Sequence, residues 1–295
     1  MRKAFLCLLW CGILLSACQQ KTSEERRLPV TGNAVYYWQT DFRLDSAKLE
    51  FLGRHHISRI YCRYFDVVNN AQHGLLPNAD ISFHDVSKIP DSIDIVPTVF
   101  IMEECMRQPH DSLARLIVNR IVKMNTTNDV RNVHEIQIDC DFTARSRDDY
   151  YHFLGQVREE AKRCGMALST TIRLHQLAMP PPPADYGVLM LYNTGDPNRA
   201  NERNPILDTR DVAPYLRYLP DYPLPMAAAY PVFAWQRTVE GIHVEHQVEA
   251  SVVLDVKHAV EQRRPELKQL IITYDLSRTS INRYKPEDYE KIYHH

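Results

Sequence analysis

The chain has 295 residues, with 35 basic and 37 acidic side chains and a formal net charge of −2. It has no basic block or stripe, so nucleic acid is not an expected partner. Its length allows one large hydrophobic core, and α/β barrels commonly reach this length as a single domain. The sixteen tyrosines suit both sugar faces and protein cores, so composition alone selects no ligand.

Residues 1–17 predict a secretory signal peptide. Arg2 and Lys3 precede an apolar run that is too short to span a membrane comfortably, and small residues follow it. The segment LLSAC at 14–18 resembles the lipobox of bacterial lipoproteins, which implies cleavage before Cys18 and lipidation of that residue. The alternative is an ordinary export signal. Residues 18–33 are polar and predict a flexible tether, so we expect a lipid-anchored protein of the cell envelope, at the outer membrane.

From residue 34 onward, apolar runs that predict strands alternate with helical patterns. The predicted strands are 34–38, 59–67, 94–101, 135–142, 166–174, 186–193, 223–235 and 267–276. The predicted helices are 43–57, 111–125, 146–165 and 248–264, and residues 69–92 form an irregular polar insert. Within 146–165, Ser146 is the expected N-cap and Gly165 the expected end of the helix.

This alternation predicts parallel β/α units, and eight of them predict a closed (β/α)₈ TIM barrel over residues 34–295 as a single domain. The rival fold is a doubly wound open sheet. It is disfavoured because the chain has only nine glycines and no glycine-rich turn between a strand and a helix.

The segment EIQIDCDFTARS, residues 135–146, carries polar side chains at every second position. Gln137, Asp139 and Asp141 share one face of the predicted strand, and the apolar side chains share the other. The apolar face suits a covering layer of helices, so the polar face should point into the barrel lumen. We expect Asp141 to lie nearest the mouth, within reach of Tyr192.

Active sites of such barrels lie at the carboxyl ends of the strands, where this chain places carboxylates, amides and aromatic rings. No GxSxG, P-loop or HExxH motif is present, whereas carboxylates supply the acid and base for glycosidic cleavage. The expected substrate-binding residues are Trp38, Tyr64, Arg173, Tyr192, Asn193, Asp196, Tyr230, Trp235, Tyr274 and Asp275.

The segment IDCDFT at 138–143 is similar to the fourth-strand motif DGxDxDxE of chitinase-like family 18 glycoside hydrolases. Asp139 and Asp141 match its last two aspartates, and LMLYN at 189–193 similarly resembles the family's sixth-strand Met-x-Tyr-Asp. The resemblance implies a barrel in which the motif's glutamate protonates the leaving oxygen. The neighbouring aspartate and the tyrosine then steady the acetamido group of the substrate. The whole chain also resembles a bacterial family named domain of unknown function 3142.

Two positions depart from the motif. Thr143 stands where the catalytic glutamate belongs, and a threonine hydroxyl cannot act as the general acid. Ile136 replaces the first aspartate. Glu103 or Glu104, from the end of the third strand, are candidates to replace the missing glutamate.

Asp139 and Asp141 are separated by roughly 6.5 Å along a strand, so both carboxyl groups should not ionise at their usual pKa. We expect one pKa to rise, with Asp141 handling the proton and Asp139 as its electrostatic partner. The structural alternative is that the two acids pair with Arg63 or Arg173 and only hold the lumen together.

The favoured function is therefore a glycoside hydrolase-like enzyme of the envelope. The alternative is a non-catalytic glycan-binding lipoprotein that has lost the catalytic acid, and a third class is an envelope scaffold. The expected partner is a glycan or another small molecule, and membrane contact is expected through the lipid alone. We expect a monomer without a cofactor.

Histidine and cysteine spacing predicts no metal site. His243 and His246 are expected on a solvated loop or helix face, and His55 and His56 at the surface or boundary of a helix. The cysteines that follow Cys18 lack zinc-binding spacing, so we expect most of them to be reduced core residues, with one bridge possible: Cys62, Cys105, Cys140 and Cys164.

Overall fold

The computed structural model describes residues 31–108, 111–195, 203–239 and 242–294, apart from the side chains at 237–239 and 242–244. Eight parallel strands form a closed ring, because β1 pairs with both β13 and β3. The predicted (β/α)₈ barrel is confirmed. In the order of the ring, its strands are β1 (Gly32–Tyr37), β13 (Leu270–Tyr274), β10 (Met226–Pro231), β9 (Tyr186–Met190), β8 (Ala167–Arg173), β7 (Glu135–Asp139), β6 (Asp94–Ile101) and β3 (Ile57–Asn70).

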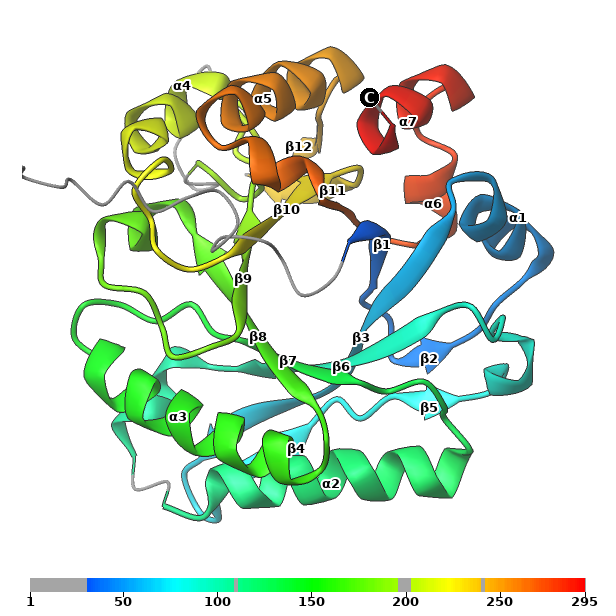
Figure 1. Cartoon of the computed structure of the whole chain (residues 1–295). Coiled ribbons are helices and arrows are strands. Elements are labelled where there is room, and N and C mark those ends of the chain that lie inside the picture. Colours follow the sequence, from blue (N-terminus) through cyan, green and yellow to red (C-terminus); the bar gives the residue numbers. More distant parts are fainter. Residues whose placement is uncertain (1–30, 109–110, 196–202, 240–241, 295) are drawn as a thin grey trace, which may run out of the picture.

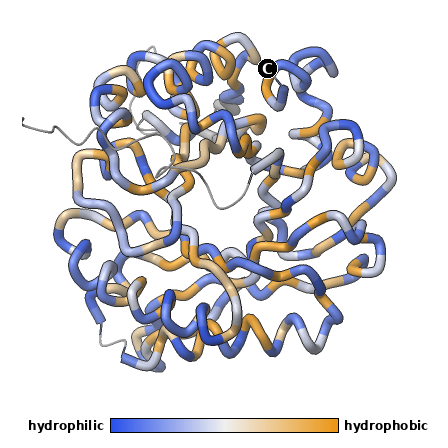
Figure 2. The backbone as a smooth tube through the Cα atoms, in the orientation of Figure 1, coloured by the Kyte–Doolittle hydropathy of each residue, from blue (hydrophilic) through white to orange (hydrophobic). Residues whose placement is uncertain are grey.

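The longer helices lie outside the ring of strands (Figure 1). Hydrophobic and hydrophilic residues alternate along them (Figure 2), as expected for helices that cover a sheet with one side. In the described part of the chain, no helix is long and apolar enough to cross a membrane. The first four overlap the predicted helices and the fifth was not predicted: α1 (Ser46–Arg54), α2 (Leu113–Asn128), α3 (Arg147–Arg163), α5 (Ala250–Arg263) and α7 (Pro286–Tyr293).

Two connections differ from a simple β/α alternation. In the insert at 69–92, β4 (Gly74–Asn78) pairs antiparallel with the end of β3, and β5 (Ser82–Phe83) pairs with β2 (Asp41–Phe42). The predicted strand 223–235 is wrong in extent. Pro223 and Pro225 lack the N–H that a ladder needs, so β10 begins only at Met226. After β10, β11 (Ala234–Val239) forms an antiparallel hairpin with β12 (Ile242–Gln247).

The remaining connections use short helices. The short α-helices are α4 (Thr209–Val212) and α6 (Arg278–Ile281), and the 3₁₀ helices are η2 (Val86–Lys88), η3 (Glu103–Arg107), η4 (Leu174–Ala178), η5 (Ala213–Tyr218) and η6 (Pro265–Lys268).

Local sequence sets the ends of the longer helices. The Asp45 side chain accepts a hydrogen bond from the Lys48 N–H and caps α1. Ser146 is not the side-chain cap that the sequence predicted for α3. Its backbone is helical, and its hydroxyl accepts from the Thr143 N–H at 3.1 Å. Gly165, with φ of 74°, lies just past the end of α3 as expected.

The two faces of β7 point where the alternation predicted. The Tyr36 hydroxyl of β1 donates to Gln137 Oε1 at 2.7 Å, and β1 and β7 are not neighbours, so this bond crosses the lumen. On the other face, Phe142 stacks on Tyr150 of α3 with ring centroids 4.9 Å apart. The strand ends at Asp139, so Asp141 lies beyond it at the mouth.

A second polar cluster fills the lumen near the amino end of β7. The Glu135 carboxylate binds Arg59 Nη1 at 2.6 Å and accepts from Ser169 Oγ at 2.5 Å and the Tyr186 hydroxyl at 2.6 Å. Burial raises the pKa of Glu135, although the charge of Arg59 opposes this shift. The barrel interior is therefore tied together by a buried ion pair as well as by hydrophobic packing.

No disulfide joins the four cysteines that the structure describes, so the bridge left open by the sequence is not formed among them. Cys62, Cys105 and Cys140 are buried, as expected for core residues, and burial raises the pKa of each thiol. Cys164 is exposed at the end of α3 and is not a core residue.

We expect Cys164 to react with iodoacetamide much faster than the other three, because the thiolate is the nucleophile and needs access to the reagent. Peptide mapping by mass spectrometry after timed labelling of the folded protein measures each rate. Labelling after denaturation is the control, since all four should then react alike. Fast labelling of Cys62 or Cys140 in the folded protein would contradict the buried positions.

Candidate functional site

Asp139 is the innermost carboxylate at the carboxyl ends of the strands. It is 4% exposed, and the Thr171 hydroxyl of β8 donates to its Oδ1 at 2.7 Å. Burial raises the pKa of Asp139, and the negative charge of Asp141 raises it further, while Arg173 opposes the rise. The expected rise in one pKa of the pair therefore falls on Asp139.

Arg173 links the two aspartates. Its Nε donates to Asp141, whose side chain is 54% exposed, and its Nη2 lies 3.9 Å from Asp139 Oδ1. Burial lowers the pKa of Arg173, but the charges of Asp139 and Asp141 outweigh burial and raise it, so the guanidinium stays charged.

Arg173 also faces Tyr192. Its guanidinium carbon lies 5.6 Å from the centre of the Tyr192 ring. Its Nη1 is buried and has no hydrogen-bond partner among the described residues. A buried donor without a partner is unfavourable in the free protein. Another part of the guanidinium forms a side-chain hydrogen bond with Tyr192, so Arg173 links the aspartates to the aromatic rings.

A cavity of about 270 Å³ lies beside this pair. Asn193 is one of the residues that line the cavity. Its backbone is left-handed, with φ of 54°, a conformation that asparagine tolerates better than most residues. The cavity is lined by Asp141, Arg173, Leu174, His175, Met190, Tyr192, Asn193, Thr194 and Tyr215.

Aromatic rings form a cluster next to the cavity. The Tyr192 and Tyr274 centroids are 4.9 Å apart, and Tyr274 lies 5.7 Å from Trp38. Phe233 contacts both tyrosines, with centroids 5.8 Å and 5.4 Å away. Trp38, Tyr192 and Tyr274 are therefore brought together as the sequence expected.

Glu103 lies beside the residue that replaces the motif's glutamate. The Thr143 hydroxyl donates to Glu103 Oε1 at 3.1 Å, and Arg107 forms an ion pair with the same carboxylate at 3.1 Å. Hydrogen bonds from the hydroxyls of Ser146 and Thr143 lower the pKa of Glu103. A carboxylate does reach this position, but in its ionised form, which is unsuited to donating a proton at neutral pH.

Solved structures resemble this barrel, although no family model and no curated protein matches the sequence. A chitinase from Chromobacterium violaceum has a TM-score of 0.60 and 13% identity, covering 89% of this chain and 98% of that one. A chitinase from Bacteroides thetaiotaomicron has a TM-score of 0.60 and 10% identity, covering 90% and 99%. The Bacillus cereus spore cortex-lytic enzyme SleL has a TM-score of 0.55 and 14% identity, covering 90% and 74%.

The fold is what these proteins share with this chain. At such low identity the likeness extends to the barrel and not to the chemistry of its mouth. The resemblance to the domain of unknown function 3142 family stays a prediction, because no family model matches the chain.

Two residues predicted to bind substrate do not face the lumen. Tyr64 is fully buried, and its hydroxyl donates to Asn125 of α2 at 2.7 Å. Tyr230 is fully buried and lies in register with Thr273, whose hydroxyl bonds Tyr293 of α7 at 2.5 Å. Neighbours in register share a face of the sheet, so Tyr230 points into the helical layer. Both predictions were wrong because they considered only how near each residue is to the end of its strand. Side chains alternate between the two faces of a strand, and these two lie on the face that is turned toward the helices.

Two other predicted residues have partners outside the cluster, and a third is not described. Asp275 accepts from Ser277 Oγ at 2.9 Å and Ser280 Oγ at 2.6 Å, so its carboxylate supports the start of α6. Trp235 lies on β11, and the centroid of its ring is 6.2 Å from that of His246 on β12. Asp196 lies outside the described residues.

Sequence reasoning missed Thr171, Phe233 and the partnership of Glu103 with Thr143. Thr171 could have been found, because Ser169, Thr171 and Arg173 alternate in the same way as the polar residues of β7. Phe233 carries no such signal, because it follows the end of β10 and its direction depends on the turn into β11.

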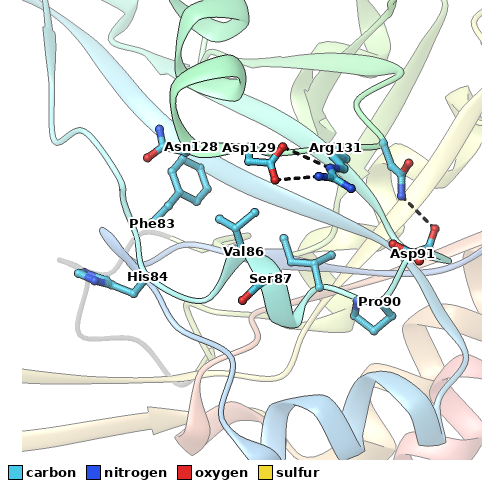
Figure 3. Close-up of a pocket in the computed structure, with 11 residues that line it drawn as sticks. Phe83, His84, Val86, Ser87, Pro90, Asp91, Asn128, Asp129 and Arg131 are labelled. Atoms are coloured by element: carbon cyan, nitrogen blue, oxygen red, sulfur yellow. Dashed lines mark hydrogen bonds and ion pairs between the residues drawn. The ribbon is translucent and has the colours of Figure 1, made fainter.

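A larger cavity, of about 460 Å³, is shown in Figure 3. Its lining residues precede β6 and β7, so it lies near the amino ends of these strands. Arg131 in its wall is already bound to Asp129 at 2.9 Å, as the dashed lines in Figure 3 show. We assign the functional site to the smaller cavity, which is lined by Asp141 and Arg173, because Arg173 also lies next to the buried carboxyl group of Asp139.

Proposed function

We propose that this chain is a carbohydrate-active protein of the glycoside hydrolase type, which binds an oligosaccharide across the carboxyl ends of its barrel strands. One observation carries the proposal. Asp139, a buried carboxyl group with a raised pKa, lies next to the charged pair of Asp141 and Arg173 and to a cluster of aromatic rings. Glycosidic cleavage needs a carboxyl group that stays protonated beside one that stays ionised.

The roles of the two aspartates are the reverse of those expected from the sequence. Asp139 is the candidate proton donor, since burial favours its neutral form. Asp141, paired with Arg173, is the anionic partner, and its exposure lets it contact a sugar. The Trp38 and Tyr274 rings offer flat surfaces for stacking against sugar faces.

The solved chitinases and the cortex-lytic enzyme suggest which glycans to test first. Their names point to chitin and to spore cortex, and the family resemblance points to an acetamido group held by Asp141 and Tyr192. We propose a substrate that carries N-acetylated amino sugars. The lipobox at 14–18 supports a place in the cell envelope, with lipid on Cys18.

A second function is favoured by a separate observation. Thr143 replaces the glutamate of the motif, and the neighbouring Glu103 has a lowered pKa. A barrel with these features and an inactive Asp139 would bind glycans without cleaving them. Both functions need the same cavity, and they differ in turnover alone.

The proposal is tested by titrating the protein with chitooligosaccharides and peptidoglycan fragments in a calorimeter while reducing ends are assayed in parallel. Binding with release of reducing ends supports the enzyme, and binding without release supports the second function. No binding to any glycan of the panel would refute both.

The variant Asn193→Gly tests whether glycans bind in the smaller cavity. We expect it to weaken glycan binding by roughly three- to tenfold, the loss of one hydrogen bond, while glycine keeps the left-handed backbone unstrained. Arg131→Ala, in the cavity of Figure 3, is the matched control and should leave the affinity unchanged. The opposite pattern, with weaker binding in Arg131→Ala alone, would move the site to that cavity.

A further inference from the structure

His55, Glu290 and His294 bring three metal-binding side chains together on the outside of the barrel. His55 follows the last residue of α1, Glu290 lies in the last turn of α7, and His294 follows the last residue of α7. His55 Nδ1 is 3.7 Å from Glu290 Oε1, and His294 Nε2 is 3.5 Å from Glu290 Oε2. One ligand atom from each residue can be chosen so that all lie within 4.8 Å of one another.

His55 has an unpartnered nitrogen in this cluster. Its side chain is 1% exposed, and Nδ1 is buried without a hydrogen-bond partner in the described part of the chain. The centroid of the His55 ring lies 4.6 Å from that of Phe51 and 5.2 Å from that of Tyr293, on which it stacks. These contacts fix the orientation of the ring and therefore the direction of Nδ1. A neutral imidazole binds a metal ion through the ring nitrogen that carries no proton.

Glu290 and His294 are four residues apart at the end of α7, and the 3.5 Å between their side chains shows that they lie on the same side of this helix end. Their side chains are 49% and 37% exposed, so an ion can enter from solvent. Ligand atoms about 2.1 Å from a tetrahedral zinc ion are about 3.4 Å from each other. The two distances from Glu290 to the histidines lie within a few tenths of an ångström of this value, and each histidine uses a different carboxylate oxygen. A single set of three ligand atoms lies within 4.8 Å, so side-chain rotations would have to draw the atoms together around an ion.

We propose that His55, Glu290 and His294 bind a divalent transition-metal ion of the zinc class, which fastens the C-terminal helix α7 to α1. Two imidazoles and one carboxylate suit Zn²⁺ and not Mg²⁺ or Ca²⁺, which prefer oxygen ligands alone. Water completes the coordination on the exposed side. The role is structural, because the cluster lies among the outer helices and not among the aspartates of the mouth.

Zinc binding is measured on the full chain, produced without a histidine tag, treated with a chelator and then titrated with ZnCl₂ against a chromophoric competitor. We expect one Zn²⁺ per chain and a rise in Tm on its addition. Glu290→Gln and His294→Ala should each weaken binding at least tenfold and remove the rise in Tm. His258→Ala, an exposed histidine of α5, is the matched control and should bind as the parent does.

Co²⁺ in place of Zn²⁺ gives an independent readout, since its visible absorption reports nitrogen and oxygen ligands in a tetrahedral site. Circular dichroism without metal verifies that each variant is folded, and Glu290→Gln keeps both the size and the exposure of the residue. Less than one tenth of an ion per parent chain would overturn the proposal. Equal affinity in the parent and in both cluster variants would also overturn it, because the ion would then lie elsewhere.

Discussion

Asp139→Asn is expected to lower the turnover of a cleaved glycan by about 10²- to 10⁴-fold, the usual contribution of a positioned general acid. The amide has the size of the carboxyl group and still accepts a hydrogen bond from Thr171, so glycan affinity should change only a few-fold. Initial rates and calorimetric titrations on the same glycan measure the two effects separately.

The dependence of turnover on pH tests whether Asp139 is the group that donates the proton. Because the pKa of Asp139 is raised, its neutral form persists to higher pH than that of an ordinary aspartate, and turnover should fall as the pH rises through that pKa. Asp129→Asn makes the same chemical change at the cavity of Figure 3 and should leave turnover unchanged. Full activity in Asp139→Asn, with loss in Asp141→Asn, would restore the assignment made from the sequence.

The largest effect on stability is expected at the other end of the lumen. Glu135→Ala should lower the free energy of unfolding by about 3–5 kcal/mol, because Arg59 would stay buried without its nearest carboxylate. Arg59 would keep only Asp94, at 3.0 Å, and the hydroxyls of Ser169 and Tyr186 would lose their acceptor. Urea denaturation followed by circular dichroism measures the change.

Glu50→Ala is the matched control. Glu50 pairs with Arg54 at the surface of α1, and such exposed pairs contribute under about 1 kcal/mol. If both variants lost the same small amount, the ion pair in the lumen would not hold the barrel together.

The pH dependence of stability has a definite sign here. The pKa of Glu135 is raised in the folded state, so between the unfolded and folded pKa values the folded protein binds more protons. This group therefore contributes less to stability as the pH rises through that interval. Glu135→Gln removes the titration, and the fall assigned to this group should disappear from the stability profile.

The sequence predicted the barrel well, because each strand carries its own alternating or continuous apolar pattern. β7 is the clearest case. Its period of two placed Gln137 and Asp139 in the lumen without knowledge of any other strand, and Tyr36 confirms that placement. The same rule would have turned Tyr230 toward the helices had it been applied to β10.

The sequence did not allow contacts between distant segments to be predicted. Glu103 meets Thr143 because η3 turns the chain after β6, and no local pattern fixes that direction. His55 and His294 lie near opposite ends of the chain, and they meet because the first and last helices are neighbours in a closed ring. Spacing rules for metal sites examine short stretches of sequence, so they gave no sign of this cluster.

The direction of β1 decides how the protein would stand on a bilayer. Gly32 opens this strand at its amino end, where its N–H donates to the Gln269 carbonyl at 2.7 Å, while the candidate cavity lies at the carboxyl ends of the strands. If Cys18 carries the proposed lipid, the thirteen residues 19–31 can hold the barrel at most about 45 Å from its anchor. The lipid would then be attached at the end of the barrel opposite the cavity, so the anchor itself would not block the approach of a long polymer to the cavity.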